Sequence, residues 1–460
     1  MASGLAALAW PRAAAAAAEP LAAILARSGL GAVTGVAVAD AATGAMIEVH
    51  SADVALPPAS VAKVPTALFA LDTLGGGYRF RTRVRGTGAI VGGRVQGDLV
   101  LDGGGDPLLD TDGMGELVAA VRARGITSVA GRFLVVDGAL PRLSEIEPGQ
   151  PPQAGYNPAV SGMNLNFNRV HVDWAPTERG PKLGVTAPGT QFNTVVAGIT
   201  ADVGEGRGLR HRNGGGREIW TLPRGALSGR GSIWLPVRRP AAYAGEVFRS
   251  LAAGAGLALP AAEVVRHAPA GVGIAGAASP PMTDVMAGML HYSTNLTAEV
   301  AGLAAAGAPA TLEASAARMN DWLRRRYGIG GADFVNHSGL TDRSRITPAA
   351  LVRLLLAENG RLPHLLRERI PKLADGSPAL PTGARVLAKT GTMNFAAALA
   401  GYVERSDGRR LAFAILAADL GARGLLPDPA ADNHPGAISW SNRARAQEAA
   451  LLRRWALLTG

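Results

Sequence analysis

Residues 57–75 read PPASVAKVPTALFALDTLG, a loop followed by a segment with the hydrophobic periodicity of a helix. The apolar residues between Val64 and Leu71 keep helical spacing, and Ser60 stands shortly before the first of them. The pattern predicts a helix with Ser60 at its N-terminal end. Lys63 follows three residues later, so we expect its side chain on the same face, within reach of the Ser60 hydroxyl.

The Ser60 and Lys63 pair suggests nucleophilic catalysis. A serine hydroxyl is a weak nucleophile and needs a base to take its proton. A lysine in a dry site beside a second cation can be neutral near neutral pH, whereas arginine, with a pKa above about 12, stays protonated. Only four of the 46 basic residues are Lys, at positions 63, 182, 372 and 389. By itself, the pair also fits a helix cap beside a surface lysine.

Two further motifs follow this S-x-x-K sequence. They are S-x-N at Ser293–Asn295 and K-T-G at Lys389–Gly391. Composition alone would produce all three on the order of 0.003 times, so chance is a poor explanation. We expect Ser293 to pass a proton to a leaving amine and Asn295 to hold the substrate amide. An ordinary turn between helices is the alternative interpretation of this pair.

The third motif lies in a predicted strand, residues 386–392, which we place at the edge of a sheet. Lys389, Thr390 and Thr392 are expected to bind a C-terminal carboxylate, and Gly391 completes this substrate-binding segment. Lys389 is also the candidate second cation beside the base. The backbone N–H groups of Thr392 and Ser60 are expected to form an oxyanion hole. An exposed strand without a catalytic role is the alternative.

Together the motifs resemble the D-alanyl-D-alanine carboxypeptidases/endopeptidases of the penicillin-binding protein 4 type, the low-molecular-mass class C penicillin-binding proteins. The resemblance runs from Leu30 to about Ala418 and includes GDLVLDGGGDPLL at 97–109 and YNPAVSGMNLNFNRV at 156–170. It implies an α/β fold of the α+β kind. A serine β-lactamase/transpeptidase-like domain, with an antiparallel sheet flanked by helices, would be interrupted by inserted β-rich domains.

The resemblance also implies a function. The chain would be a serine D,D-peptidase that hydrolyses the terminal D-Ala-D-Ala bond and/or the D-Ala cross-links of peptidoglycan stem peptides through an acyl-enzyme, and β-lactams would inhibit it covalently. A β-lactamase or esterase on the same fold is one alternative, and a non-catalytic murein-binding scaffold is another. No E-x-x-L-N motif lies between Ser60 and Ser293, which disfavours rapid β-lactam turnover. Residues 336–341 read NHSGLT where the family usually has DGSGLS, so an acidic loop residue is missing.

The 460 residues are enough for two or three domains. We expect the catalytic domain in two pieces, 19–80 and 276–460, and an inserted β-rich block at 81–275. In that block Asn164, Asn166 and Asn168 alternate as on one face of a strand, which suggests a substrate groove or, alternatively, a solvated face.

Residues 1–18 end in an A-x-A pattern, as before a signal-peptide cleavage site. They suggest a trimmed signal peptide and an exported, periplasmic protein, although an alanine-rich helix start has the same composition.

Other chemistries find little support. There is no Cys, so thiol catalysis and thiolate metal sites are excluded, and the eight His are dispersed without metal-ligand spacing. Nucleotide-binding glycine motifs are absent, so we expect neither a cofactor nor a metal. The net charge of +10 comes from scattered Arg with few aromatic neighbours, which disfavours nucleic-acid binding. No run of eighteen apolar residues predicts a membrane span, and the oligomeric state stays open.

Overall fold

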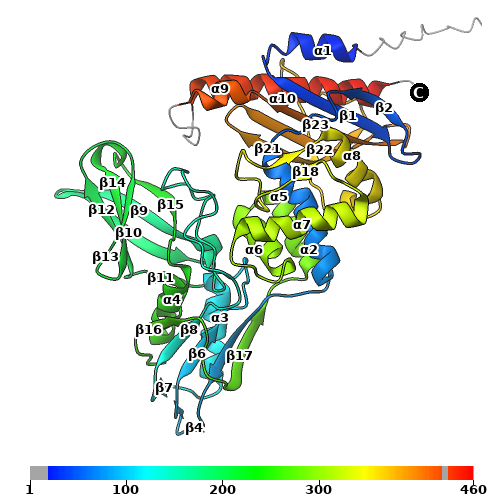
Figure 1. Cartoon of the computed structure of the whole chain (residues 1–460). Helices are drawn as coiled ribbons and strands as arrows, with labels where there is room; N and C mark the ends of the chain where they lie inside the picture. Colours follow the sequence, from blue (N-terminus) through cyan, green and yellow to red (C-terminus); the bar gives the residue numbers. More distant parts are fainter. Residues whose placement is uncertain (1–18, 427–433, 459–460) are drawn as a thin grey trace, which may run out of the picture.

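The computed structural model describes residues 19–426 and 434–458, so the expected signal-peptide remnant at 1–18 lies outside the described residues. The chain forms two lobes (Figure 1). One contains the N-terminal and C-terminal parts of the chain, and the other contains the middle part. Several sheets combine with helices, which confirms the expected mixed α/β fold.

The first lobe is built on a six-stranded antiparallel sheet. In sheet order its strands are β2 (Met46–His50), β1 (Val33–Asp40), β23 (Arg410–Ala418), β22 (Ala396–Glu404), β21 (Arg385–Met393) and β20 (Glu368–Arg369). Strands β1 and β2 form a hairpin around the turn sequence DAATG at 40–44.

Helices cover both faces of this sheet, which is why its central strands are almost entirely apolar. Large side chains such as Phe413 pack with Trp455 of the long helix α10 (Pro435–Leu457) on one face. Small ones such as Ala414 join the larger core on the other face, where α8 (Pro348–Ala357) packs against the sheet. A short helix, α1 (Leu21–Arg27), packs on α10.

A helical cluster lies beside this sheet. It consists of the 3-10 turn η1 (Ala59–Ala62) and the helices α2 (Lys63–Leu74), α5 (Met282–Tyr292), α6 (Asn295–Ala305) and α7 (Leu312–Tyr327). Helix α2 is buried from Lys63 to Leu71 and contacts the other three helices. Helix α6 is buried on nearly all faces, as its mostly apolar sequence requires.

The second lobe begins directly after α2. Strand β3 (Arg81–Gly86) leads into it, and β17 (Val272–Ala278) returns antiparallel beside β3. At the junction the backbone groups of Phe80 and Ser279 bond to each other, and the Ser279 hydroxyl accepts from Phe80 N at 3.0 Å. The middle of the chain therefore leaves and re-enters the first lobe at one point (Figure 1).

Four sheets form this lobe together with α3 (Thr111–Ala123) and α4 (Pro240–Gly254). The main sheet has the order β16 (Ala262–Val265), β8 (Phe133–Val136), β6 (Leu99–Asp102), β3 and β17. The smaller ones are β11 (Asn193–Val195), β10 (Gly180–Pro188), β9 (Arg169–Thr177) and β15 (Gly231–Pro236); β12 (Ile199–Gly204), β14 (Arg217–Pro223) and β13 (Arg210–Gly214); and β4 (Ile90–Val91), β5 (Arg94–Val95) and β7 (Ser128–Val129). The first lobe adds β18 (Ala332–Asp333), β19 (Arg345–Ile346) and α9 (Leu420–Gly424).

The alternating asparagines do not lie on a strand face, so the groove hypothesis for them is wrong. Asn166, Phe167 and Asn168 form a turn with φ of 51°, 56° and 52°, a left-handed conformation that Asn tolerates well. All three Asn side chains are buried. Asn168 donates to the Ala159 carbonyl at 2.8 Å and to Asn164 Oδ1 at 2.7 Å, so these amides hold the turn together instead of facing a substrate.

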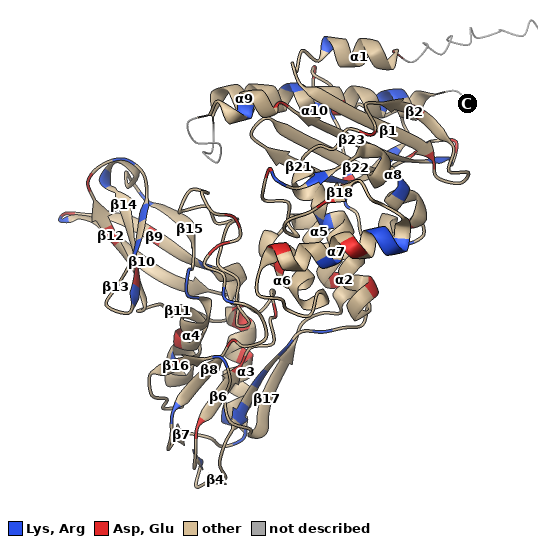
Figure 2. Cartoon of the chain, in the orientation of Figure 1, with Lys and Arg blue, Asp and Glu red and all other residues tan. Residues whose placement is uncertain are grey.

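Lys and Arg are scattered over both lobes and gather on no single face in this view (Figure 2). Across residues 19–426 and 434–458, no helix is both long and apolar enough to cross a membrane.

Candidate active site

The three motifs meet where the helical cluster joins the sheet. Ser60 lies at the start of the helical segment, Ser293 ends α5, and Lys389 lies on β21. Ser60 and Ser293 line a cleft of about 670 Å³, to which the second lobe contributes Glu147 and Tyr156. The cleft wall also includes Asn295 of the second motif and Thr392, which directly follows the third motif.

Lys63 is fully buried, and its Nζ contacts three oxygen atoms. It lies 2.9 Å from Ser60 Oγ, 2.7 Å from Asn295 Oδ1 and 2.7 Å from the Ser338 carbonyl oxygen. The last two are acceptors only, so they engage two of the amine hydrogens. When the amine is neutral, its lone pair is left for the Ser60 hydroxyl, which is the geometry of a general base.

The electrostatics of the two lysines favour a neutral base. Burial lowers the pKa of Lys63 well below its usual value, and the charge of Lys389 lowers it further, against the opposing effect of Glu299. Burial, together with the charge of Arg369, lowers the pKa of Lys389 to about 7. A neutral Lys63 beside a partly protonated Lys389 is therefore accessible near neutral pH.

Lys389 also orients the second serine. Its Nζ donates to Ser293 Oγ at 2.9 Å and to the Thr390 carbonyl at 2.7 Å. Ser293 has φ of 60° and ψ of 35°, and its backbone N–H donates to the Met289 carbonyl at 2.8 Å. A left-handed serine costs of order 1–3 kcal/mol, so the surrounding packing must hold it in place.

Gly391 allows β21 to approach the nucleophile closely. A Cβ at this position would lie 2.6 Å from the Pro58 carbonyl oxygen and 2.8 Å from Ser60 N. Ala59, directly before Ser60, has φ of 43°, so the nucleophile follows a strained residue. The close approach of the strand therefore explains why the third position of the K-T-G motif is a glycine.

The expected edge position of β21 needs a correction. Strand β20 lies beyond it, but it pairs only with Val386 and Leu387, so the half that carries the motif is open. Ala388 N donates toward this side, to the Arg367 carbonyl at 3.1 Å. Because antiparallel strands alternate in the direction of their polar groups, the N–H of Thr392 points to the same open side.

Asn295 connects the two lobes. Its Nδ2 donates to the Tyr156 carbonyl at 2.9 Å, while its Oδ1 accepts from Lys63. Sequence reasoning did not identify Tyr156, because a backbone carbonyl leaves no signal in the residue pattern. It also missed Glu299, although a lone Glu four residues after Asn295 in an apolar helix was a usable signal.

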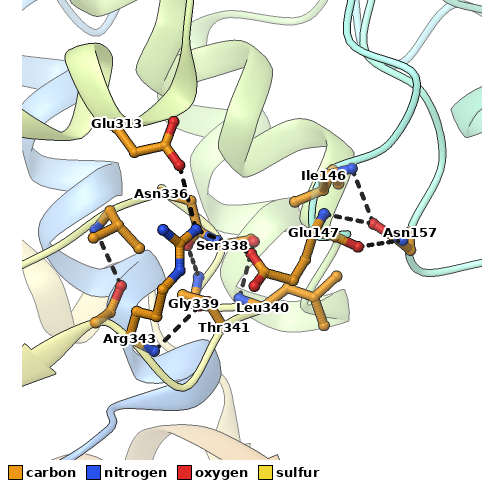
Figure 3. Close-up of polar contacts among 12 residues, drawn as sticks. Ile146, Glu147, Asn157, Glu313, Asn336, Ser338, Gly339, Leu340, Thr341 and Arg343 are labelled. Atoms are coloured by element: carbon orange, nitrogen blue, oxygen red, sulfur yellow. Dashed lines mark hydrogen bonds and ion pairs between the residues drawn. The ribbon is translucent and has the colours of Figure 1, made fainter. Parts of the chain in front are cut away.

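The loop that departs from the family pattern contributes Leu340 and Thr341 to the wall of the cleft. Figure 3 shows the polar contacts of this loop. Asn336 Oδ1 accepts from Gly339 N at 2.9 Å, so the amide still supplies a loop-closing acceptor. His337 is fully buried, and burial lowers its pKa to about 3, so the ring is neutral. Its ring packs against Gly302, where a Cβ would lie 2.1 Å from the imidazole.

Residues 19–426 and 434–458 contain no group of three or more His, Asp or Glu that could hold a metal ion.

Comparisons with known proteins identify the family of the chain. Residues 17–424 match the D-Ala-D-Ala carboxypeptidase 3 (S13) family. A D-alanyl-D-alanine carboxypeptidase of Actinomadura sp. is 38% identical over 105 residues, which are 23% of this chain and 19% of that protein. The match therefore spans about a fifth of the length of that relative.

Three solved structures, of two proteins, have a similar fold. Penicillin binding protein 4 from Haemophilus influenzae aligns with a TM-score of 0.75 at 17% identity, over 93% of this chain and 98% of that one. The same protein in complex with a β-lactam gives 0.71 at 18% identity, with the same coverage. A predatory endopeptidase from Bdellovibrio bacteriovorus aligns with 0.51 at 15% identity, over 90% and 93% of the two chains. At these identities the likeness shows the fold.

Proposed function

The chain belongs to the D-Ala-D-Ala carboxypeptidase 3 (S13) family, and we propose that it is a serine D,D-peptidase acting on peptidoglycan stem peptides. It hydrolyses the terminal D-Ala-D-Ala bond and/or D-Ala cross-links through an acyl-enzyme. The observation that carries the proposal is the buried amine of Lys63, which lies 2.9 Å from Ser60 Oγ and has a lowered pKa.

Acylation begins at Ser60. Its Oγ attacks the carbonyl carbon of the scissile amide while its proton passes to the neutral Nζ of Lys63. The N–H groups of Ser60 and Thr392 receive the developing oxyanion. The remaining Nδ2 hydrogen of Asn295 is available to a carbonyl on the acyl side of the substrate.

The leaving amine takes its proton from Ser293, and Lys389 replaces that proton through its 2.9 Å hydrogen bond to Ser293 Oγ. The C–N bond then breaks and the amine departs. A water molecule attacks the ester, its proton returns through Ser293 to Lys389, and the Lys63 ammonium returns its proton to Ser60. The cycle thus ends with the protonation states with which it began.

The open half of β21 favours a substrate with a free carboxylate. Lys389 and the hydroxyl groups of Thr390 and Thr392 lie on this segment. Beyond it, the guanidinium groups of Arg367 and Arg369 form no salt bridge with an acidic residue in the described part of the chain, and Arg369 reaches Thr390 Oγ1 at 3.5 Å. A terminal carboxylate would supply the missing negative charge.

The same nucleophile accounts for inhibition by β-lactams, and the complex of the Haemophilus protein with a β-lactam supports this part of the proposal. We further propose that residues 19–80 and 276–460 are the catalytic domain, that 81–275 is an inserted β-rich domain, and that the protein is exported to the periplasm.

Labelling with a fluorescent penicillin tests the function against its alternatives. The proposal predicts stable labelling of the full chain. Transient labelling would indicate a β-lactamase or esterase, and no labelling would indicate a non-catalytic murein-binding scaffold.

A further inference from the structure

A buried carboxylate lies behind the candidate base. Glu299 belongs to α6, one turn beyond Asn295, and its side chain is fully buried. Its Oε2 accepts from His337 N at 3.0 Å, and its Oε1 accepts from Ser338 N at 2.8 Å. The Ser338 hydroxyl also bonds to it. None of the catalytic steps above uses this group.

The hydrogen bonds around Glu299 suit the charged form of the carboxyl group. Both oxygens face backbone N–H donors, and N–H donors stabilise an anion and cannot accept a proton from a carboxylic acid. Burial raises the pKa of Glu299 above its usual value, and the donors from His337 and Ser338 and the positive charge of Lys63 offset part of this rise.

Ser338 links this carboxylate directly to the base. Its N–H is held by Glu299, and its carbonyl oxygen accepts from Lys63 Nζ at 2.7 Å. The other acceptor of Lys63 is Asn295 Oδ1, which lies on the same helix as Glu299. Helix α6 therefore supplies one acceptor of the base itself and fixes the other through Glu299.

The charges around the base explain why an anion is useful there. Lys63 receives a proton during acylation, close to the cation Lys389, on which the positive charge of Arg369 also acts. His337, which also contacts this region, is neutral. Glu299 is the acidic group that acts on Lys63 among the residues described, so it offsets the positive charge that acylation creates.

We propose that Glu299 is a positioning residue for Lys63: it holds the Ser338 carbonyl that aims the amine at Ser60, and its negative charge stabilises the ammonium formed during acylation. The inference rests on the proposed function, since it assumes that Lys63 is the base. A residue that only anchored the loop would hold Ser338 in place without affecting the titration of the base.

The test is the pH dependence of the acylation rate, measured with a fluorescent penicillin on the full chain carrying Glu299→Gln. We expect the maximal rate to fall at least tenfold. We also expect the rising limb of the profile to move to lower pH, because Lys63 loses the anion that favours its protonated form. Glu358→Gln is the matched control: this buried Glu bonds to Tyr327 at 2.6 Å, away from the base, and its profile should match the wild type.

Two results with a folded Glu299→Gln protein would overturn the inference. One is a lower acylation rate whose pH profile keeps its rising limb at the wild-type pH, and the other is an unchanged acylation rate. If that variant does not fold, Ser338→Ala replaces it. This change removes the hydroxyl donor to the carboxylate, so the limb should move in the same direction by a smaller amount, and an unmoved limb again overturns the inference. Absence of labelling in the wild type would instead contradict the proposed function.

Discussion

The Tyr156 carbonyl of the second lobe lies 2.9 Å from Asn295 Nδ2, on the amide whose other end accepts from Lys63. This bond determines which way the amide faces, because a flipped side chain would place its N–H groups against the Lys63 amine and its oxygen against the Tyr156 carbonyl oxygen. The second lobe therefore takes part in orienting the candidate base as well as in lining the cleft.

Loosening the segment before Tyr156 should slow acylation. Asn157 is fully buried and clamps this segment: its Oδ1 accepts from Ile146 N and Glu147 N, each at 2.9 Å (Figure 3). Asn157→Ala leaves these donors without a partner, at about 1–3 kcal/mol, and we expect at least a threefold lower rate of penicillin acylation.

The matched control for Asn157→Ala is Arg343→Ala. Arg343 joins Glu147 to Glu313 through ion pairs of 3.6 and 3.3 Å in which its own guanidinium is half exposed, and ion pairs open to solvent contribute only about 0–1 kcal/mol. Its acylation rate should stay close to wild type. Equal rates for both variants and the wild type would show that the clamp has no influence on the base.

Replacing the base by a permanent cation should abolish acylation. Lys63→Arg keeps the positive charge, but its guanidinium cannot take the Ser60 proton near neutral pH. We expect less than about a tenth of the wild-type acylation rate at every pH that the protein tolerates, measured by stopped-flow labelling. A variant that retained more activity would point to another base.

Recognition of the carboxylate should depend on pH through Lys389. Its pKa of about 7 means that it is charged at lower pH and neutral at higher pH. For a peptide with a free terminal carboxylate, KM should therefore rise as the pH is raised through this value. With Lys389→Met, the KM of this peptide should be high and independent of pH, whereas the KM of an amidated peptide should change little with pH or with the substitution. Equal increases in KM on both peptides would contradict binding of the terminal carboxylate by Lys389.

The contact between Gly302 and His337 predicts a loss of stability. An alanine Cβ at position 302 would lie 2.1 Å from the buried ring, and such overpacking costs about 1–3 kcal/mol. Gly302→Ala should lower the free energy of unfolding by that amount in a urea titration. Gly288→Ala on α5, where a Cβ meets nothing within 4 Å, should leave it unchanged or raise it. Similar values for the two variants would contradict the packing argument.

The local parts of the site could be predicted from the sequence, because helical spacing brings Lys63 beside Ser60 without knowledge of the rest of the fold. The presence of the three motifs in this order connects Ser293 and Lys389 with Ser60 and Lys63. Tyr156 and Ser338 could not be predicted, since each acts through a backbone carbonyl that tertiary packing places.

Two expectations failed for physical reasons. The alternation of Asn164, Asn166 and Asn168 is typical of a strand, but the same residue type also stabilises left-handed turns, and here that preference prevails. The motif strand is open only along its second half, because β20 pairs with its first half. The sequence did not predict β20, since a strand of two residues is too short to be recognised from hydrophobic periodicity.

The central claim is that Ser60 forms the acyl-enzyme, and mass spectrometry of the intact and digested protein after incubation with penicillin tests it most directly. We predict a mass increase of one penicillin per chain, located on the peptide that contains Ser60 and missing in Ser60→Ala. Stable labelling of a folded Ser60→Ala protein, or a modified residue elsewhere in the wild type, would contradict the account.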